Sequence, residues 1–342
     1  MFSSNTSHVG LLTVLAVSSS TTPFITTYPW SGSGFGTKYS DPATLPTGIG
    51  NGVAFSPGGS AIAVAHTTTP FISAYPWSGS GFGTKYSDPA TLPVSTGNSV
   101  AFSPSGSAIA VAHDTSPRIS TYPWSSSGFG TKYSNPATLP TGNGRGVAFS
   151  PDGTAIAVAH NTTPFITAYP WSGSSFGTKF SNPATLPADS GLGVAFSPDG
   201  SAIAVAHANS PYITAYPWSG SGFGTKYADP ATLPSLTGNG VAFSPDGTAI
   251  AVAHGDTPFI TAYPWSGSGF GTKYSNPATL PTNNGRGVAF SPDGSSLAVA
   301  HGDSPRISVY PWSNSGFGTK YADPATLPTG DGRGVAFTQI IS

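Results

Sequence analysis

GVAFSPDGTAIAVAHNTTPFITAYPW, residues 146–171, is the most informative stretch of this sequence, because close copies of it recur along almost the whole chain. Each copy ends in a tryptophan, and the seven tryptophans follow one another at a constant spacing of 47 residues. A fixed period of this length is typical of solenoids, propellers and other repeat arrays. The pattern inside one repeat decides between these architectures.

One repeat contains four segments that favour β-strands. GVAFS is a short β-prone run, and PDG after it indicates a tight hairpin turn. AIAVAH is apolar on both faces, as in a strand buried between two layers, and FITAYPW alternates again after the NTTP turn. FGTKFSNP is the predicted fourth strand, with a lysine and a proline that suit an exposed edge. Four antiparallel strands in about 40–45 residues predict a propeller blade.

The two ends of the chain indicate a closed ring. The last repeat starts at Gly334 and contains one strand only, while TVLAVS, Thr13 to Ser18, stands in the register of a second strand and lacks a first one. We therefore predict an all-β, seven-bladed propeller over residues 1–342, with four antiparallel strands per blade, closed when the C-terminal strand completes the N-terminal blade. The first blade takes residues 11–46 and 334–341, and later blades begin near residues 52, 99, 146, 193, 240 and 287.

That register also explains GLLTVLAVSSS, residues 10–20, which otherwise resembles the apolar part of a secretory signal. Residues 1–10 contain no Lys or Arg, so the basic segment that precedes such a signal is missing. We interpret the stretch as a divergent second strand of the first blade.

The composition restricts the classes of partner. Charged residues make up 7% of the chain and the net charge is −1, which provides no clustered basic surface for nucleic acid or an anionic membrane. No apolar run approaches the roughly 18 residues of a membrane span. Glu and Cys are both absent, and 44 Gly and 34 Pro disfavour helices. The low charge and abundant Ser, Thr and Gly suit an extracellular or virion-associated protein, and near-identity of the repeats indicates recent amplification or a consensus-style sequence.

VAFSPDGTAIAVAH followed by ITAYP resembles the blades of WD40-type propellers and of bacterial YVTN-type propellers over essentially the whole chain. The FSPDG turn carries the resemblance. The sequence departs from the WD40 pattern, because no Gly-His dipeptide precedes the first strand and Tyr-Pro stands where Trp-Asp is expected. The resemblance implies the blade plan, whereas the WD40 hydrogen-bond network is not implied.

Variation among the repeats indicates a candidate binding face. FGTK and PATLP recur in every repeat, whereas the second-to-third and fourth-to-first loops differ from repeat to repeat. In an up-and-down blade both loops open on one face, which we call the top face. Loops on a rigid scaffold commonly carry binding sites, although exposed loops also drift after duplication. The candidate ligand-binding charges on this face are Arg145, Arg286, Arg333, Arg118, Arg306, Asp114, Asp256 and Asp303.

The second strands of six blades end in a histidine, and Ser19 takes this place in the first blade. The six are His66, His113, His160, His207, His254 and His301. Blade geometry separates neighbours by about 9–10 Å, too far to share a metal that needs nitrogens about 2 Å away. We predict no metal and no cofactor. The histidines are expected to bond adjacent loops, with ligand contact as the alternative.

The Tyr-Pro-Trp aromatics predict either a core between blades or an exposed carbohydrate platform, and the lysines are expected to protect the outer edge. No nucleophile elbow, phosphate-binding loop or HExxH motif is present. Similar blades also place similar residues symmetrically, whereas catalysis needs different residues at one place.

We predict a non-enzymatic binding or structural propeller, as a monomeric ring, for a protein, a glycan or an anionic ligand. The alternatives are a multivalent carbohydrate-binding propeller and, third, a metal-dependent hydrolase of the propeller-lactonase kind.

Overall fold

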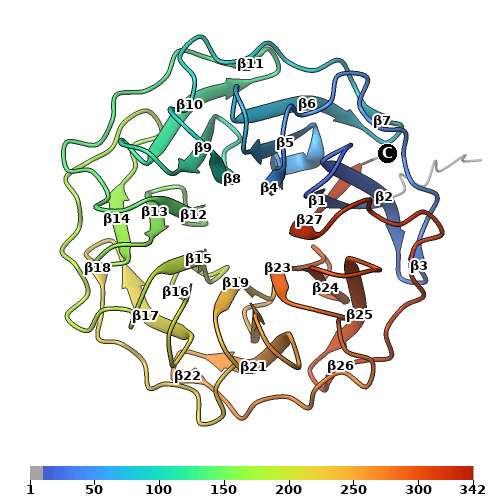
Figure 1. Ribbon diagram of the computed structural model, residues 1–342. Coiled ribbons are helices and arrows are strands. Elements are labelled where there is room, and N and C mark those ends of the chain that lie inside the picture. Colours follow the sequence, from blue (N-terminus) through green and yellow to red (C-terminus); the bar gives the residue numbers. More distant parts are fainter. Residues whose placement is uncertain (1–10, 342) are drawn as a thin grey trace, which may run out of the picture.

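The computed structural model describes residues 11–341, which form a closed ring of seven β-sheets around a central channel (Figure 1). Six sheets have four strands, and the fourth blade has three strands plus one isolated bridge between Trp171 and Phe176. The predicted seven-bladed propeller is thus confirmed. In six blades the chain runs from the channel outward and then crosses to the next blade, whereas the inner strand of the first blade comes from the C-terminal end of the chain.

The inner and second strands pair antiparallel in every blade. The inner strands are β4 (Gly50–Phe55), β8 (Gly97–Phe102), β12 (Gly144–Phe149), β15 (Gly191–Phe196), β19 (Gly238–Phe243), β23 (Gly285–Phe290) and β27 (Gly332–Ile341). The second strands are β1 (Leu11–Ser19), β5 (Ala61–His66), β9 (Ala108–His113), β13 (Ala155–His160), β16 (Ala202–His207), β20 (Ala249–His254) and β24 (Ser296–His301).

The third strands follow a short loop on the top face, and the outer strands are very short. The third strands are β2 (Ile25–Ser31), β6 (Ile72–Ser78), β10 (Ile119–Ser125), β14 (Ile166–Pro170), β17 (Ile213–Ser219), β21 (Ile260–Ser266) and β25 (Ile307–Ser313). The outer strands are β3 (Gly34–Phe35), β7 (Gly81–Phe82), β11 (Gly128–Phe129), β18 (Gly222–Phe223), β22 (Gly269–Phe270) and β26 (Gly316–Phe317). The turn from β4 to β5 contains a short 3₁₀ helix, Pro57–Gly59.

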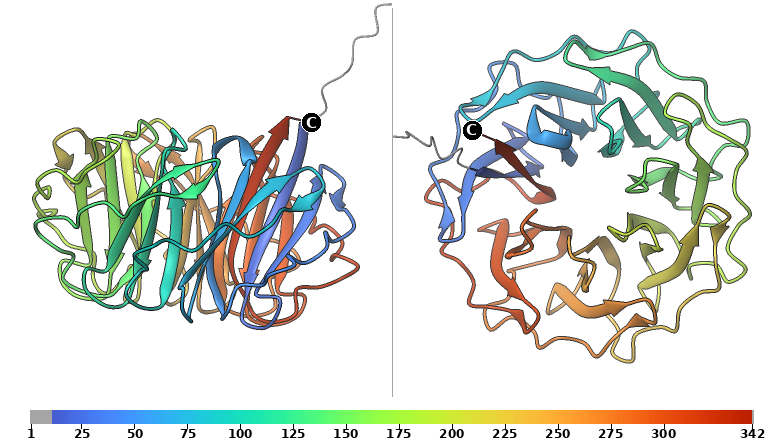
Figure 2. Two further views of the ribbon diagram at one scale, coloured as in Figure 1. Left: turned by 90° about the horizontal axis from the view of Figure 1, so that it is seen from above. Right: turned by 180° about the vertical axis from the view of Figure 1, so that it is seen from behind.

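Closure occurs in the blade that holds both ends of the described chain. β27 pairs with β1 in the register Leu15↔Phe337, and this sheet has the order β27-β1-β2-β3. Both strands are longer than their counterparts and reach beyond the ring on one face (Figure 2, left). The C-terminal strand therefore completes the N-terminal blade, as predicted.

The outer strand is shorter than predicted. Regular pairing stops at Phe35 in the first blade, although Gly36 N and Tyr39 N still donate to carbonyls of β2 at 2.8 and 3.0 Å. Lys38 lies beyond the strand, and its Nζ contacts Asp41 Oδ1 at 2.5 Å. Each of the other repeats places an Asp or Asn three residues after its lysine and forms the same contact.

The core lies between neighbouring blades, because small residues of one sheet face large residues of the next. Ala202 and Ala204 of the fifth blade pack against Ile250, Val252 and Trp265 of the sixth. Alternation along AIAVAH sends alanines to one neighbour and Ile and Val to the other, so a strand with both faces apolar is required. All residues of this strand are buried in each of the six blades that contain it.

The tryptophans belong to this core, which confirms the first of the two predictions made for them. Trp265 is 7% exposed and makes edge-to-face contacts with Phe243, Phe270 and Tyr227, at centroid distances of 5.1–5.2 Å. Equivalent tryptophans are 4–8% exposed. Edge-to-face geometry is favourable for aromatic quadrupoles. Rings buried in this way are not available as flat platforms for sugars.

PATLP recurs because it anchors each crossover to the blade that it enters. Tyr75 is fully buried, and its hydroxyl donates to the Thr44 carbonyl at 2.8 Å. All seven equivalent tyrosines make this bond, at 2.7–2.9 Å. Burial raises the pKa of these tyrosines well above its ordinary value, so the hydroxyl remains a donor.

Candidate functional site

A β-bulge at the start of every inner strand builds the mouth of the channel. In the second blade Gly50 pairs with His66 and Gly52 pairs with Ala65, so Asn51 between them is an extra residue. A bulge re-aims the side chain of the extra residue. The seven bulge residues are Asn51, Asn98, Arg145, Leu192, Asn239, Arg286 and Arg333.

The residues before and after each bulge residue must be small. A Cβ on Gly50 would lie 2.4 Å from the Phe24 carbonyl oxygen, and one on Gly52 would lie 3.1 Å from the Asn98 carbonyl oxygen. The first contact is closer than real Cβ atoms allow. The inner strands thus approach one another closely, and only the bulge position is free to vary.

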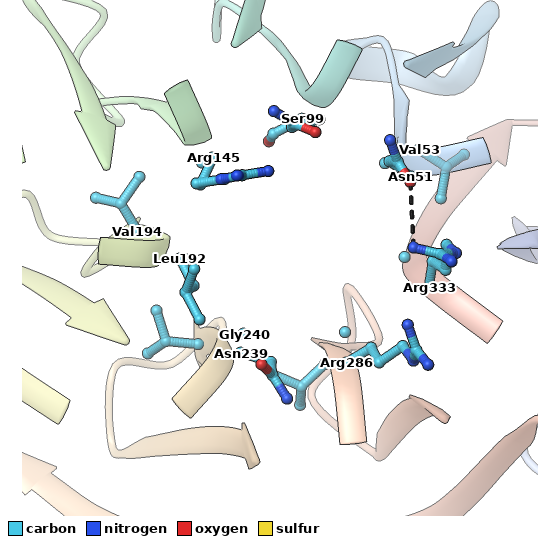
Figure 3. A pocket seen from close by; sticks show the side chains of 18 of the residues that line it. Asn51, Val53, Ser99, Arg145, Leu192, Val194, Asn239, Gly240, Arg286 and Arg333 are labelled. Carbon is cyan, nitrogen blue, oxygen red and sulfur yellow. Dashed lines mark hydrogen bonds between the residues drawn. The ribbon is translucent and has the colours of Figure 1, made fainter. Parts of the chain in front are cut away.

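The bulge residues line a cavity of about 200 Å³ at the centre of the ring (Figure 3). Three of them are arginines, and they are not evenly distributed. Arg286 and Arg333 come from the adjacent strands β23 and β27, whereas Arg145 lies across the channel from them (Figure 3). Leu192 supplies an apolar segment of the wall.

The asparagines mainly hold the ring together. Nδ2 of Asn51, Asn98 and Asn239 donates to the carbonyl of a glycine on the next inner strand, at 2.7–3.0 Å. Asn98 Nδ2 also lies 2.8 Å from Asp114 Oδ1. These bonds tie neighbouring blades together at the mouth.

The three arginines have different electrostatic surroundings. Arg145 forms an ion pair with Asp114 at 3.3 Å, and Arg286 forms one with Asp331 at 3.1 Å. Arg333 has no carboxylate within 4.0 Å among residues 11–341 and donates to Asn51 Oδ1 at 3.4 Å. Burial and the nearby Arg286 lower the pKa of Arg333 below its ordinary value, while Asp331 acts in the opposite direction.

The structure brings together only part of the predicted set. Arg145, Arg286 and Arg333 line the mouth, and Asp114 pairs with one of them. Asp331 also belongs to this group, and the sequence analysis missed it. The sequence does contain a signal for it: Asp331 stands two residues before Arg333, in the only GDGRG segment of the sequence.

The other predicted charges lie away from the cavity. Arg118 and Arg306 follow the cis-prolines of the top loops, and Arg118 donates to the Pro140 carbonyl at 3.2 Å. Asp256 Oδ1 accepts from Thr257 N at 2.7 Å, and Asp303 Oδ2 accepts from an asparagine side chain at 3.0 Å. Their role in binding remains a prediction, without support from a shared site.

The histidines are buried completely. Nε2 of each shares a hydrogen bond with a Ser or Thr hydroxyl of the adjacent third strand, at 2.8–3.0 Å. Burial lowers the pKa of each from 6.5 to about 4, so the rings are neutral at physiological pH. The predicted bonds to adjacent loops are therefore wrong for most of them, because the nearest polar group is a hydroxyl of the neighbouring strand; only His254 and His301 also contact a loop, through Nδ1 at 3.2 and 3.3 Å. A ligand could reach these buried side chains only if the blade opened.

Within residues 11–341 no group of three or more His, Cys, Asp or Glu side chains lies close enough to hold a metal ion. The described chain also contains no helix that is long and apolar enough to cross a membrane.

The comparisons with known proteins identify the architecture. No protein-family model and no curated protein matches the sequence. Among solved structures, a Bacteroides fragilis protein described as a "putative 6-phosphogluconolactonase" superposes with a TM-score of 0.77 at 14% identity, over 97% of this chain and 99% of that one. The periplasmic gluconolactonase PpgL of Pseudomonas aeruginosa gives 0.72 at 16% identity, over 96% and 99%.

Hydrazine synthase of Kuenenia stuttgartiensis gives a TM-score of 0.63 at 14% identity, over 86% of this chain and 95% of that one. These three proteins carry different names on one fold, so the similarity defines the class of protein and not its activity. The chain is a seven-bladed propeller similar to the gluconolactonase propellers, rather than to WD40 proteins in particular.

Proposed function

We propose that this protein is a non-enzymatic binding propeller that holds a small anion at the channel mouth, between Arg286 and Arg333. The observation that carries the proposal is the unshared charge of Arg333. Three guanidinium groups face two carboxylates at the mouth, which leaves one positive charge in excess. The Nε atoms of Arg286 and Arg333 are also buried without a partner among the described residues.

A planar guanidinium donates two parallel hydrogen bonds to a carboxylate or phosphate, so these are the chemical groups we expect. The cavity volume corresponds to roughly seven times the share of one water molecule, about 30 Å³. A ligand of this size is a small organic acid or a phosphorylated metabolite. A macromolecule would have to present such a group at the mouth.

The test is a titration with phosphate, gluconate and 6-phosphogluconate, followed by calorimetry. We expect at least one of them to bind to the wild type, with an affinity that falls as salt is added. Arg286→Asn together with Arg333→Asn copies the residue at three other bulges and should preserve the ring. Loss of charge-assisted bonds of about 1.5–3 kcal/mol corresponds to weakening by about 10–100-fold.

Arg118→Phe is the matched control. It removes one positive charge from the top face and copies Phe71 and Phe165, but it lies outside the cavity. Binding that survives the double variant, or that fails equally in Arg118→Phe, would contradict the proposed site.

The second candidate function is hydrolysis of a sugar lactone. It is favoured by the similarity to the Pseudomonas gluconolactonase over nearly the whole chain. Against it, both carboxylates at the mouth are held in ion pairs with arginines. Hydrolysis of gluconolactone by the wild type, abolished in Asp331→Asn, would replace the non-enzymatic proposal.

A further inference from the structure

A groove between the second and third blades differs from the other grooves of the ring. It lies on the bottom face, away from the channel mouth, and encloses about 320 Å³. The turn of the second blade supplies Ser56 and Ser60, and the third blade supplies Ser105, Trp124 and Ser126. Tyr86 lies on the crossover between them. A volume above about 300 Å³ is typical of a small-molecule site.

The groove has no charged lining residue, and the repeat variation explains why. The turns here read SPGG, residues 56–59, and SPSG, residues 103–106, whereas the next four blades read SPDG. In those blades the aspartate caps its own turn: Asp152 Oδ1 accepts from Ser150 Oγ at 2.5 Å and from Thr154 N at 3.0 Å. Ser105 stands in that place: its hydroxyl contacts the hydroxyls of two serines at 2.7 and 3.1 Å and accepts from Ser107 N at 3.4 Å, so this turn is capped without a charge.

Tyr86 leaves its hydroxyl available in the groove. The equivalent hydroxyls of Tyr39, Tyr133 and Tyr321 donate to a glycine carbonyl of the next blade at 3.0–3.4 Å. Tyr86, like Tyr227 and Tyr274, forms no such bond, and Ser126 stands at the position of the glycine found in most repeats. The ring of Tyr86 packs edge-to-face on Trp124 with centroids 5.1 Å apart. One phenol and several exposed serine hydroxyls therefore converge beside an aromatic pair.

We propose that this groove binds a neutral carbohydrate. Hydroxyl groups of the protein can both donate to and accept from sugar hydroxyls. The half-buried ring of Tyr86 and the exposed Pro57, rather than the buried Trp124, provide apolar contact for the C–H groups of a sugar ring. An anionic or cationic ligand would find no opposite charge among the lining residues. The site is independent of the channel mouth, since the two share no residue.

The experiment uses substitutions that another repeat already carries. Neutral glycans are screened on an array, and hits are titrated by saturation-transfer NMR. We expect one site per chain in the wild type. The test variant combines three substitutions: Ser105→Asp, Tyr86→Phe and Ser126→Gly. Each introduces the residue that another repeat has at the equivalent position, namely Asp152, Phe180 and Gly173. Loss of about three hydrogen bonds predicts at least tenfold weaker binding.

Tyr227→Phe is the control, because it makes the same change at a different pair of blades and should leave glycan binding unchanged. The single Tyr86→Phe variant, for which Phe180 is the precedent, serves if the combined variant fails to fold. No neutral glycan bound by the wild type, or equal binding by the combined variant, would overturn the proposal. Neither result depends on anion binding at the channel mouth.

Discussion

Single residues decide how closely the blades approach at the channel. The glycine before each bulge lies against a carbonyl of the preceding blade: a Cβ on Gly238 would be 2.2 Å from the Tyr212 oxygen. That carbonyl already accepts from His207 N at 3.0 Å. A side chain here must displace the loop or the strand.

We expect Gly238→Ala to lower the free energy of unfolding by about 1–3 kcal/mol, the usual cost of overpacking a core. Gly220→Ala is the matched control, since nothing lies within 4 Å of a Cβ there. Chemical denaturation of the two variants beside the wild type measures the difference. Equal stability of both variants would show that the close approach is relaxed in solution.

The buried histidines make the stability depend on pH. Their pKa is about 4 in the folded protein and about 6.5 when unfolded, so the unfolded chain takes up protons first as the pH falls. Stability is therefore fullest above about pH 6.5 and decreases down to about pH 4, by at most about 1.4 kcal/mol per pH unit for each histidine. His207→Ser copies Ser19 of the first blade and should reduce this slope. Unfolding midpoints measured from about pH 7 to about pH 4.5 test it, and an unchanged slope would contradict it.

At the scale of elements, each crossover segment is attached to a blade by backbone hydrogen bonds, a tyrosine hydroxyl and an aromatic cluster. The Tyr263 hydroxyl donates to the Thr232 carbonyl at 2.7 Å, and the ring packs on Phe270 at 5.5 Å. The outer strand contributes only two residues of regular pairing. The tyrosine bond is therefore the link between the buried core of the blade and the PATLP segment that enters it.

We expect Tyr263→Phe to reduce stability by about 1–3 kcal/mol, because the Thr232 carbonyl loses its donor. The packing of the ring is retained, so the loss reports on the hydrogen bond. Tyr227→Phe, which copies Phe180, should cost much less. Urea unfolding of the two variants separates these outcomes, and a smaller loss in Tyr263→Phe than in Tyr227→Phe would contradict the assigned role.

At the scale of the whole molecule, closure depends on a strand from the far end of the chain. β27 fills the inner position of the first blade, where Val335 and Phe337 pack against Leu15, Val17 and Trp30. Without β27, the inner edge of β1 has no partner in its sheet. An unpaired edge of this kind favours pairing with another chain.

We expect removal of residues 334–342 to lower the melting temperature strongly and to cause association between molecules. Removal of residues 339–342 is the control, because the other inner strands end at the position of Phe337 and the shorter deletion keeps that pairing. Calorimetry measures the melting temperature of each deletion variant, and light scattering measures its association. Similar melting temperatures for both deletions would show that ring closure does not depend on the strand.

The sequence by itself determined the number of blades, the strand order and the closure, because period, alternation and the incomplete terminal repeats are linear patterns. It also identified Arg145, Arg286 and Arg333 from their place before the inner strands. Only the tertiary structure revealed that these residues are bulge residues aimed into the channel. A bulge is a mismatch in register between two strands, and neither strand shows it alone. Likewise, Arg145 and Arg286 form ion pairs with Asp114 and Asp331, whereas Arg333 has no carboxylate within 4.0 Å among residues 11–341. These pairings depend on which loops meet at the mouth, and that is decided by the tertiary structure.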